Sequence, residues 1–339
     1  MRLLRRALAT TAAIAAAMTV ISGCSSGTES SDGIRFALDW TPNTNHTGLY
    51  VAIQEGYFAD AGLDVSILPY NNTSPDTLVD AGNAEFGIST QSQATFAHAA
   101  GAETTAVIAP LQHRATGIGV KADRTDITRP RDLDGKIYAG FGDPGEVETL
   151  QQVIRNDGGT GNFTTVALGT SAYEAVYSGK ADFTVSYFAW EGLEAERNGT
   201  PMRYFQYTDY GFPDAYSIVI NGNQKWLKDH PDEAAKFVQA VQRGYQTAAD
   251  DPDRAAQDLI DANPGAFTDE DLVRDSQRML AADFMKDADG VVGRQNLETW
   301  SGYSGFLFDN GLLAGPDGKK LTQEPSWSEY FTNEYLAAP

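Results

Sequence analysis

FALDWTPNTNHTGLYVAIQEGYF, residues 36–58, combines a short apolar run, a polar loop and a helical pattern. Residues 36–38 have the character of a strand, and Pro42 ends regular structure because proline fixes φ and has no N–H. Residues 43–47 are rich in short polar side chains, which favour helix N-caps over helix interiors. From Leu49 the apolar residues recur at helical spacing. The stretch therefore predicts a strand, a loop and a helix in direct succession.

This polar loop is the first candidate for the wall of a binding site. Open α/β sheets bind ligands where a loop at the carboxyl end of a strand leads into a helix. One helix N-cap needs only one of these short polar residues, so capping leaves most of the loop unexplained. We therefore expect ligand-facing side chains here, at Trp40, Asn43, Asn45 and His46.

The first 33 residues have the composition of an export and anchoring segment. A basic start precedes an apolar run, residues 7–20, which is too short to span a bilayer comfortably. Residues 21–24, ISGC, resemble a bacterial lipobox, in which the cysteine becomes the lipid-modified first residue. We predict a lipoprotein signal peptide at 1–23, lipidation of Cys24 and a flexible tether at 24–33. The alternative is an ordinary signal peptide with an incidental cysteine.

Charge and length exclude several kinds of partner. The formal net charge is −21 over 339 residues, which disfavours nucleic acid and anionic membrane surfaces. A chain of this size usually forms about two lobes or domains. After residue 20 no apolar run is long enough to cross a membrane. We therefore expect a tethered globular protein that is exported and monomeric.

Short strands alternate with helices along most of the chain, which predicts an α/β fold with mostly parallel sheets between helices. The phrase LVDAGNAEFGIST at 78–90 returns as AVYSGKADFTVSYFAWE at 175–191, which suggests two lobes of similar construction. We assign residues 34–120 and 216–339 to the first lobe and residues 121–215 to the second. Two crossings between lobes define a hinge, so a ligand would lie in the cleft between them.

The chain after the second crossing is helical in character. Apolar residues recur at helical spacing in four stretches, and three of these follow a residue suited to an N-cap. The predicted helices cover residues 231–248, 252–262, 269–282 and 295–310, and the cap candidates are Asp229, Asp250 and Thr268.

No spacing in the sequence supports catalysis or a metal site. The four histidines are scattered without ligand spacing, and no serine occupies a nucleophile elbow. The glycine-rich loop at 140–145 fits neither common phosphate-binding pattern, and Asp143, Glu146 and Glu148 beside it would repel an anion. We therefore expect no metal and no cofactor, and a neutral or cationic ligand in preference to a phosphate or sulfonate.

The second copy of the repeated phrase ends in aromatic residues and a carboxylate. Tyr187, Trp190 and Glu191 follow its strand at the place that Thr90 and Gln91 hold in the first copy. The rings could stack on a flat ligand, and Glu191 could accept hydrogen bonds from an amino group. The other interpretation makes the rings core residues and Glu191 the start of a helix.

Several phrases along nearly the whole mature chain resemble one family of proteins. They are LDWTPNTNHTGLYVA (38–52), EGYFADAGLDV (55–65), GNAEFGIS (82–89), RDLDGKIYAG (131–140), SGKADF (178–183) and FTNEYL (331–336). They resemble the thiamine-pyrimidine precursor-binding lipoproteins of bacterial ABC importers, which share their fold with fungal enzymes that make the thiamine pyrimidine phosphate. WTPNTNHTG is the most specific of these phrases, whereas EGYFADAGLDV marks only the wider superfamily.

The resemblance implies a type II periplasmic-binding-protein fold that captures N-formyl-4-amino-5-aminomethyl-2-methylpyrimidine or a close relative. It also implies delivery to an ABC permease driven by a cytoplasmic ATPase, with the protein held to the membrane by lipid on Cys24. A flat aminopyrimidine suits rings on its face and donors, acceptors and a carboxylate on its edge. The matching residues are Trp40, Tyr187 and Trp190 for the face, Asn43, Asn45, Gln91 and Glu191 for the edge, and Tyr216 to close the cleft.

Three alternatives stay open. The ligand could be another flat heterocycle such as riboflavin, or a small sulfonate or nitrate, as in the wider superfamily. The third alternative is an enzyme like the fungal relatives, which use a histidine in the first loop, a lysine that holds pyridoxal phosphate, and a cysteine-rich run. His46 matches that histidine, but residues 95–103 offer His98 or Ala99 in place of the lysine, and residues 211–217 contain no cysteine. These departures and the export signal disfavour the enzyme.

Overall fold

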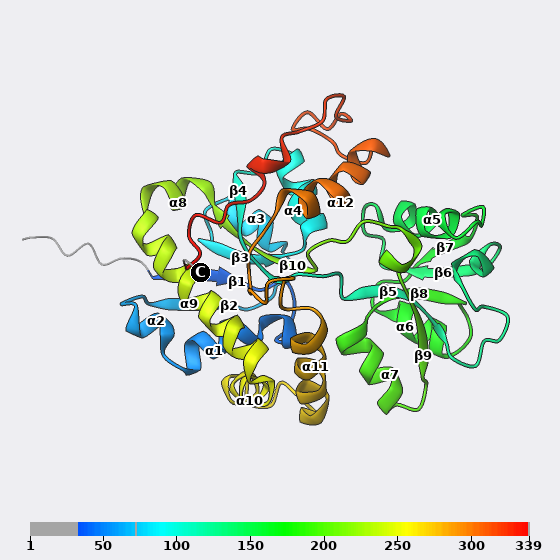
Figure 1. Ribbon diagram of the computed structural model, residues 1–339, viewed down its shortest axis with the longest axis horizontal. Helices are drawn as coiled ribbons and strands as arrows, with labels where there is room; N and C mark the ends of the chain where they lie inside the picture. The colour runs from blue at the N-terminus through cyan, green and yellow to red at the C-terminus, as the bar shows by residue number, and fades with distance from the viewer. Residues whose placement is uncertain (1–32, 72, 338–339) are drawn as a thin grey trace, which may run out of the picture. The chain divides into compact units, whose positions relative to one another are not determined.

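The computed structural model describes residues 33–71 and 73–337. The predicted signal peptide, the lipidation site Cys24 and almost all of the tether lie outside the described residues. Within them, the strands form two five-stranded sheets, with the orders β2-β1-β3-β10-β4 and β7-β6-β8-β5-β9. In Figure 1 the strands of the second sheet lie among the green elements.

The first sheet is parallel except for one strand. β1 (Ile34–Ala37) pairs in parallel with β2 (Val65–Leu68) and with β3 (Phe86–Ser89). β10 (Ile218–Asn223) lies between β3 and β4 (Thr104–Leu111) and is antiparallel to both. β3 is buried at every residue, as expected of a strand that is covered by helices on both faces.

The second sheet repeats this plan. β6 (Ile137–Gly140) pairs in parallel with β7 (Thr164–Ala167) and β8 (Phe183–Tyr187). β5 (Thr116–Lys121) lies between β8 and β9 (Met202–Gln206) and is antiparallel to both. β3 and β8, the strands of the repeated phrase, are each third in their sheet. The predicted α/β fold with mostly parallel sheets is confirmed.

Each reversed strand is the first strand after the chain has crossed from the other sheet. β5 directly follows β4, and β10 directly follows β9. The first crossing therefore lies at residues 112–115 and not at the expected boundary of 120 and 121, because β5 hydrogen-bonds to β8 and β9. The second crossing, residues 207–217, leads into β10. The other lobe boundaries stay a prediction.

Helices cover both sheets, and none of those in the described residues is long and apolar enough to cross a membrane. The part before the first crossing contains the 3-10 turn η1 (Thr44–His46), α1 (Thr47–Gln54), α2 (Tyr57–Asp60), α3 (Pro75–Asp80) and α4 (Gln91–Ala99). The part between the crossings contains η2 (Pro130–Leu133), α5 (Glu146–Asn156), α6 (Ser171–Tyr177), the π-helical turn η3 (Phe188–Gly192), α7 (Leu193–Arg197) and η4 (Thr208–Tyr210). The remainder contains α8 (Gln224–Asp229), α9 (Pro231–Asp250), α10 (Pro252–Ala262), α11 (Glu270–Asp283), α12 (Leu297–Asp309) and η5 (Trp327–Glu329).

The four predicted C-terminal helices are α9 to α12, but their predicted N-caps are wrong. Asp251 and Asp269 accept the capping hydrogen bonds of α10 and α11, one residue after the expected Asp250 and Thr268. In both cases two good capping residues stand side by side, so residue type alone does not choose between them. α9 has no side-chain cap, so Asp229 does not serve as one.

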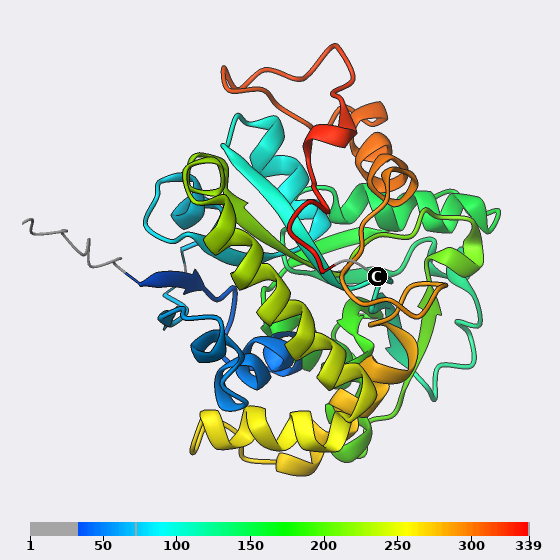
Figure 2. The same cartoon turned by 60° about the vertical axis from the view of Figure 1, so that its left-hand side comes forward.

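Helix α9 runs across the first sheet and supplies much of its core (Figure 2). Phe237 stacks on Phe86 of β3 with ring centroids 4.0 Å apart and on Phe58 at 5.3 Å. α9 also packs very closely on α1. The contact is so close that a side-chain carbon on Gly244 would overlap the carbonyl oxygen of Gly48. This packing fixes α1 and, with it, the polar loop that precedes it.

Candidate functional site

A cleft of about 230 Å³ lies where elements of the two sheets meet both crossings. One water needs only ~15 Å³ of such space, so the cleft can hold a small organic molecule. Its aromatic lining consists of Phe141, Tyr173, Tyr187, Tyr207, Tyr216 and Tyr303. Its polar and charged lining includes Thr90, Ser92, Arg114, Thr116, Asp143, Glu146, Thr149 and Ser217.

Two of the predicted ligand residues line this cleft. Tyr187 ends β8 in the second sheet, and Tyr216 stands just before β10 of the first. Burial raises the pKa of both hydroxyls, which keeps both side chains neutral. The Tyr216 hydroxyl accepts a hydrogen bond from the backbone N–H of Asn296 at 2.8 Å, and this contact fixes the ring.

Glu191 lies next to the tyrosines of the cleft. It belongs to the π-helical turn η3, which follows β8 directly, and its charge acts on Tyr173 and Tyr187. Burial raises the pKa of the Glu191 carboxyl to about 7, and the charge of Glu194 adds to this rise. Among the described residues, its buried Oε2 has no hydrogen-bond partner. A buried carboxyl with a shifted pKa beside a cleft is a candidate for ligand recognition.

The glycine-rich loop brings two further carboxyls to the cleft. Asp143 and Glu146 line it, and burial raises the pKa of both. Glu146 accepts a hydrogen bond from the backbone N–H of Phe141 at 3.2 Å, so the loop is closed by its own side chain. A side-chain carbon on Gly140 would clash with Glu146, which explains that glycine without a ligand. The two carboxyls disfavour an anion in this part of the cleft.

The polar loop before α1 is held together by its own hydrogen bonds. His46 is fully buried, with Nε2 lying 2.8 Å from Asp39 Oδ1 and Nδ1 accepting from the backbone N–H of Asn43 at 3.4 Å. Asn43 caps η1 by accepting from the backbone N–H of Asn45 at 2.9 Å. Trp40 is 46% exposed. In the described chain these loop residues are not part of the cleft lining given above, so their contact with a ligand stays a prediction.

Gln91 and Trp190 are both engaged inside the protein. The buried Gln91 amide donates to two backbone carbonyls of α12, and its Oε1 accepts from the backbone N–H of Tyr216 at 2.9 Å. Trp190 packs in a small apolar cluster, with its ring centroid 6.4 Å from that of Phe267. Trp190 is partly buried in this packing and its contact with a ligand stays a prediction, whereas Gln91 ties the second crossing to α12.

Sequence reasoning missed Arg114, which lies in the first crossing and lines the cleft. Its guanidinium carbon is 4.5 Å from the ring centroid of Tyr303 and 5.4 Å from that of Tyr207. Its backbone N–H donates to Asp214 Oδ1 at 2.9 Å, which connects the two crossings. The only signal in the sequence is a single cation placed where the chain leaves the first sheet.

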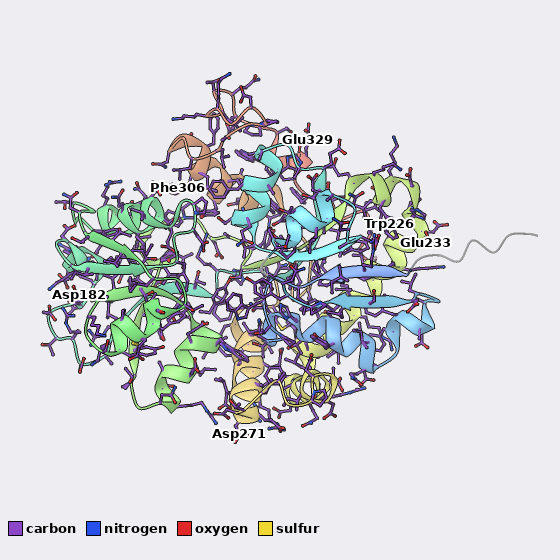
Figure 3. The ribbon with its side chains drawn as sticks, turned by 180° about the vertical axis from the view of Figure 1, so that it is seen from behind. Asp182, Trp226, Glu233, Asp271, Phe306 and Glu329 are labelled. Carbon is purple, nitrogen blue, oxygen red and sulfur yellow. The ribbon has the colours of Figure 1, made fainter. Side chains whose placement is uncertain are left out.

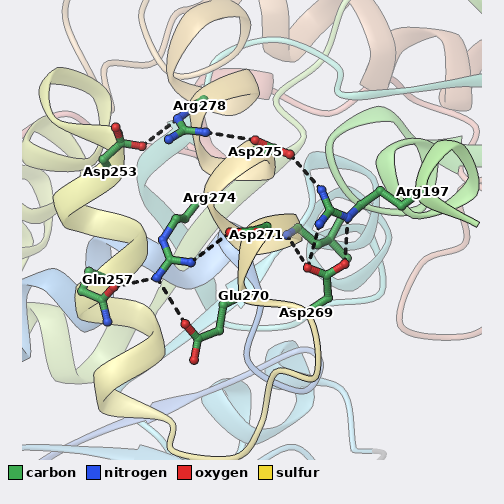
Figure 4. A network of polar contacts seen from close by, with 10 residues as sticks. Arg197, Asp253, Gln257, Asp269, Glu270, Asp271, Arg274, Asp275 and Arg278 are labelled. Carbon is green, nitrogen blue, oxygen red and sulfur yellow. Dashed lines mark hydrogen bonds and ion pairs between the residues drawn. The ribbon is translucent and has the colours of Figure 1, made fainter.

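Side-chain contacts also join the two parts of the chain around the cleft. Arg197 of α7 donates to both carboxylate oxygens of Asp269, at 2.7 and 2.9 Å, and to Asp275 of α11 at 3.0 Å (Figure 4). Phe306 of α12, labelled in Figure 3, packs edge-on against Phe212 of the second crossing with ring centroids 4.9 Å apart. A hinged protein must separate contacts of this kind to admit a ligand.

Two mixed sheets joined by two crossings form the fold of periplasmic binding proteins, and solved structures share this fold. The periplasmic aliphatic sulphonate binding protein SsuA of Escherichia coli matches with a TM-score of 0.64 at 13% identity, over 86% of this chain and 94% of that one. The alkanesulfonate-binding protein SsuA of Xanthomonas axonopodis pv. citri, bound to MOPS, matches with a TM-score of 0.61 at 13% identity, over 82% and 91%. The predicted periplasmic-binding-protein fold is confirmed.

The chain belongs to the NMT1/THI5-like family, whose model matches residues 43–255. The formylaminopyrimidine-binding protein of Halalkalibacterium halodurans is 28% identical over 310 residues, 88% of this chain and 93% of that protein. The 4-amino-5-hydroxymethyl-2-methylpyrimidine phosphate synthase THI13 of Saccharomyces cerevisiae is 25% identical over 324 residues, 91% of this chain and 89% of that protein. The family resemblance that the sequence phrases predict is confirmed, and its relatives include both a binding protein and synthases.

Proposed function

We propose that this protein is the substrate-binding lipoprotein of an ABC importer and that it captures N-formyl-4-amino-5-aminomethyl-2-methylpyrimidine or a close relative for thiamine salvage. It binds this ligand without changing it. The observation that carries the proposal is the buried Glu191 carboxyl beside the tyrosines of the cleft, in a chain 28% identical to a formylaminopyrimidine-binding protein.

A carboxyl group with a pKa of about 7 suits the edge of a 4-aminopyrimidine. That edge presents an N–H donor beside a ring-nitrogen acceptor. A protonated Glu191 can donate to the ring nitrogen and accept from the amino group. An ionised Glu191 makes the same two contacts with a protonated ring, and these are charge-assisted. The unpartnered Oε2 supplies one of the two oxygens that this pair requires.

The aromatic lining suits the face of the same ring. Tyr173, Tyr187 and Phe141 line the cleft, and Glu191 acts electrostatically on the first two. A stacked aromatic pair contributes roughly 0.5–1.5 kcal/mol beyond the area that it buries. The ring that stacks on the ligand would therefore add specificity for a flat heterocycle over a small sulfonate or nitrate.

The polar loop before α1 completes the proposed site from the first sheet. The charge of Asp39 in this loop raises the pKa of Tyr187 in the second sheet, which supports closeness of the loop to the cleft. Trp40, Asn43, Asn45 and His46 remain the proposed contacts on this side. Because Gln91 is satisfied by α12 and the second crossing, we assign it to holding Tyr216 in place.

Export, anchoring and delivery belong to the same proposal. Residues 1–23 would direct export, Cys24 would carry the lipid, and the ligand-bound monomer would dock on a permease driven by a cytoplasmic ATPase. The absence of chemistry is supported at the position where the fungal relatives carry a lysine. His98, one of the two residues aligned there, stacks on Tyr330 with ring centroids 4.0 Å apart and is thus engaged in packing.

The proposal predicts selective stabilisation by pyrimidines. Thermal unfolding is measured with the formylaminopyrimidine, its aminomethyl and hydroxymethyl relatives, thiamine, riboflavin, taurine and nitrate. A ligand at 100 times its dissociation constant adds about 2.7 kcal/mol to the free energy of unfolding, so binding raises the midpoint clearly. Mass spectrometry of the released ligand should recover it unchanged. A shift with riboflavin or an anion alone contradicts the pyrimidine assignment, and a converted ligand contradicts the absence of catalysis.

The same assay tests Glu191 directly. Glu191→Gln keeps the shape of the side chain but cannot ionise, and it should weaken pyrimidine binding by about 10- to 100-fold, since hydrogen bonds to charged groups contribute about 1.5–3 kcal/mol. Glu196→Gln, a change at an exposed carboxylate of the next helix, is the matched control and should bind as the parent does. Equal binding by both variants would remove Glu191 from the site.

A further inference from the structure

Arg114 presents an unused pair of hydrogen-bond donors at the cleft. Its Nε and Nη2 are both closed to solvent, and neither has a hydrogen-bond partner among the described residues. The central carbon of the guanidinium lies over the rings of Tyr303 and Tyr207, 4.5 and 5.4 Å from their centroids. Both rings are almost fully buried and line the same cleft. What the group lacks is therefore an acceptor along its Nε–Nη2 edge.

This edge binds two oxygens elsewhere in the same chain. Arg124 donates from Nε and Nη2 to the two oxygens of Asp126 at 2.8 and 2.9 Å, and Arg197 does the same to Asp269 at 2.7 and 2.9 Å. Arg129 makes the equivalent paired contact with Asp157. The two donors point in parallel, which is the geometry that carboxylate and phosphate oxygens match.

Leaving these donors without an acceptor is unfavourable. Burial of an unpaired polar group costs free energy, and the cost is larger for a charged group. The two tyrosine rings interact with the charge of the guanidinium but accept no hydrogen bond at its edge. The backbone contact from Arg114 to Asp214 fixes the main chain at this residue, and both donors of the edge are closed to solvent.

We infer that Arg114 is a specificity residue that receives an oxygen acceptor of the ligand, and that it selects the acylated pyrimidine over the free amine. This inference rests on the proposed function. The carbonyl oxygen of a formylamino group accepts hydrogen bonds from the Nε–Nη2 edge. A free aminomethyl group is a cation near neutral pH and would be repelled by the guanidinium. An oxyanion, such as a phosphate ester on the pyrimidine, offers the same acceptor chemistry with a full charge.

The test compares three pyrimidines on three forms of the full-length protein purified in detergent. The ligands are the formylaminomethyl, aminomethyl and phosphooxymethyl pyrimidines, and the forms are the parent, Arg114→Met and Arg114→Lys. Calorimetric titration gives the affinities, and thermal unfolding without ligand shows that each form is folded. Arg278→Met, which removes an exposed arginine bound to Asp253 and Asp275, is the control.

We expect Arg114→Met to weaken binding of the formyl ligand by about 10- to 100-fold and to strengthen binding of the amine. The ratio of the two affinities should therefore fall sharply. Arg114→Lys keeps the charge but not the paired donors, so it should weaken the formyl ligand while still rejecting the amine. Opposite changes for two ligands cannot arise from damage to the fold. If the phosphate ester shows the larger Arg114 dependence, the acceptor is an oxyanion.

Two results would overturn the inference. An unchanged ratio of formyl to amine affinity in Arg114→Met would show that Arg114 does not read this part of the ligand, while the pyrimidine function would stand. An equal loss for all three ligands with a lowered unfolding midpoint would assign Arg114 a purely structural role. If no pyrimidine binds the parent protein, the proposed function fails and this inference falls with it.

Discussion

Glu191 should make the stability of the protein depend on pH near neutrality. Its folded pKa of about 7 lies above its ordinary value of 4.5 because burial disfavours the charged form. Its contribution is therefore fully present below about pH 4.5 and is lost as the pH rises through 7. Urea unfolding at pH 5 to 8 of the parent and of Glu191→Gln isolates this effect. The variant should gain stability relative to the parent as the pH rises, and parallel pH profiles would contradict the buried carboxyl.

For single residues, the sequence indicated which side chains have suitable chemistry, but it did not show which of them already have hydrogen-bond partners inside the protein. Tyr187, Tyr216 and Glu191 could be proposed because they follow or precede strands that the pattern reveals. The two tyrosines line the cleft, and the charge of Glu191 acts on Tyr187. Gln91 has the same polar character, but only the packing of α12 shows that its amide is already satisfied. Arg114 was missed because its importance comes from what its donor edge lacks.

At the scale of elements, two helical glycines should respond to alanine in opposite ways. Gly244→Ala forces α9 away from α1 and should lower the free energy of unfolding by about 1–3 kcal/mol. In Gly305→Ala, within α12, the added carbon would lie 4.0 Å from Glu324 Oε1, so the substitution should raise stability by about 0.5–1 kcal/mol through helix propensity. Denaturant unfolding measures both changes. Equal effects of the two substitutions would contradict the tight contact between α1 and α9.

The elements themselves were largely readable from the sequence. The repeated phrase predicted two related lobes, and its strands β3 and β8 take equivalent places in the two sheets. The boundary near residue 120 was misplaced because β5 resembles any other short apolar strand, and only its hydrogen bonds to β8 and β9 assign it to the second sheet. Period and residue type reveal that a strand exists, but long-range pairing decides where it lies.

For the whole molecule, the contacts of Arg197 should favour the conformation in which α7 and α11 are joined. Both partners are exposed to solvent, so the interaction is weak and salt weakens it further. Arg197→Gln should increase the radius of gyration of the ligand-free protein in X-ray scattering at low salt and weaken ligand binding by less than about fivefold. Arg278→Gln, whose contacts stay within α10 and α11, should change neither quantity. Identical scattering of the parent and Arg197→Gln would show that the contacts of Arg197 do not hold α7 and α11 together.

The two crossings are themselves joined. His113 Nδ1 lies 2.8 Å from Asp214 Oδ2, and the backbone N–H of Ala115 donates to the Ser217 hydroxyl at 2.6 Å. The hydrogen bond that His113 donates to Asp214 raises the pKa of the imidazole, so this pair strengthens as the pH falls. Rotation of one sheet against the other would therefore occur about a pair of connected segments, which limits the motion to a hinge.

The position of β10 between β3 and β4 also sets the order in which a growing chain can fold. Strands β5 to β9 follow one another along the chain and complete the second sheet by residue 206. The first sheet lacks an interior strand until residues 218–223 have left the ribosome or the translocation channel, although β1 to β4 were made first. The middle of the nascent polypeptide can therefore complete its sheet before the amino-terminal half can complete its own.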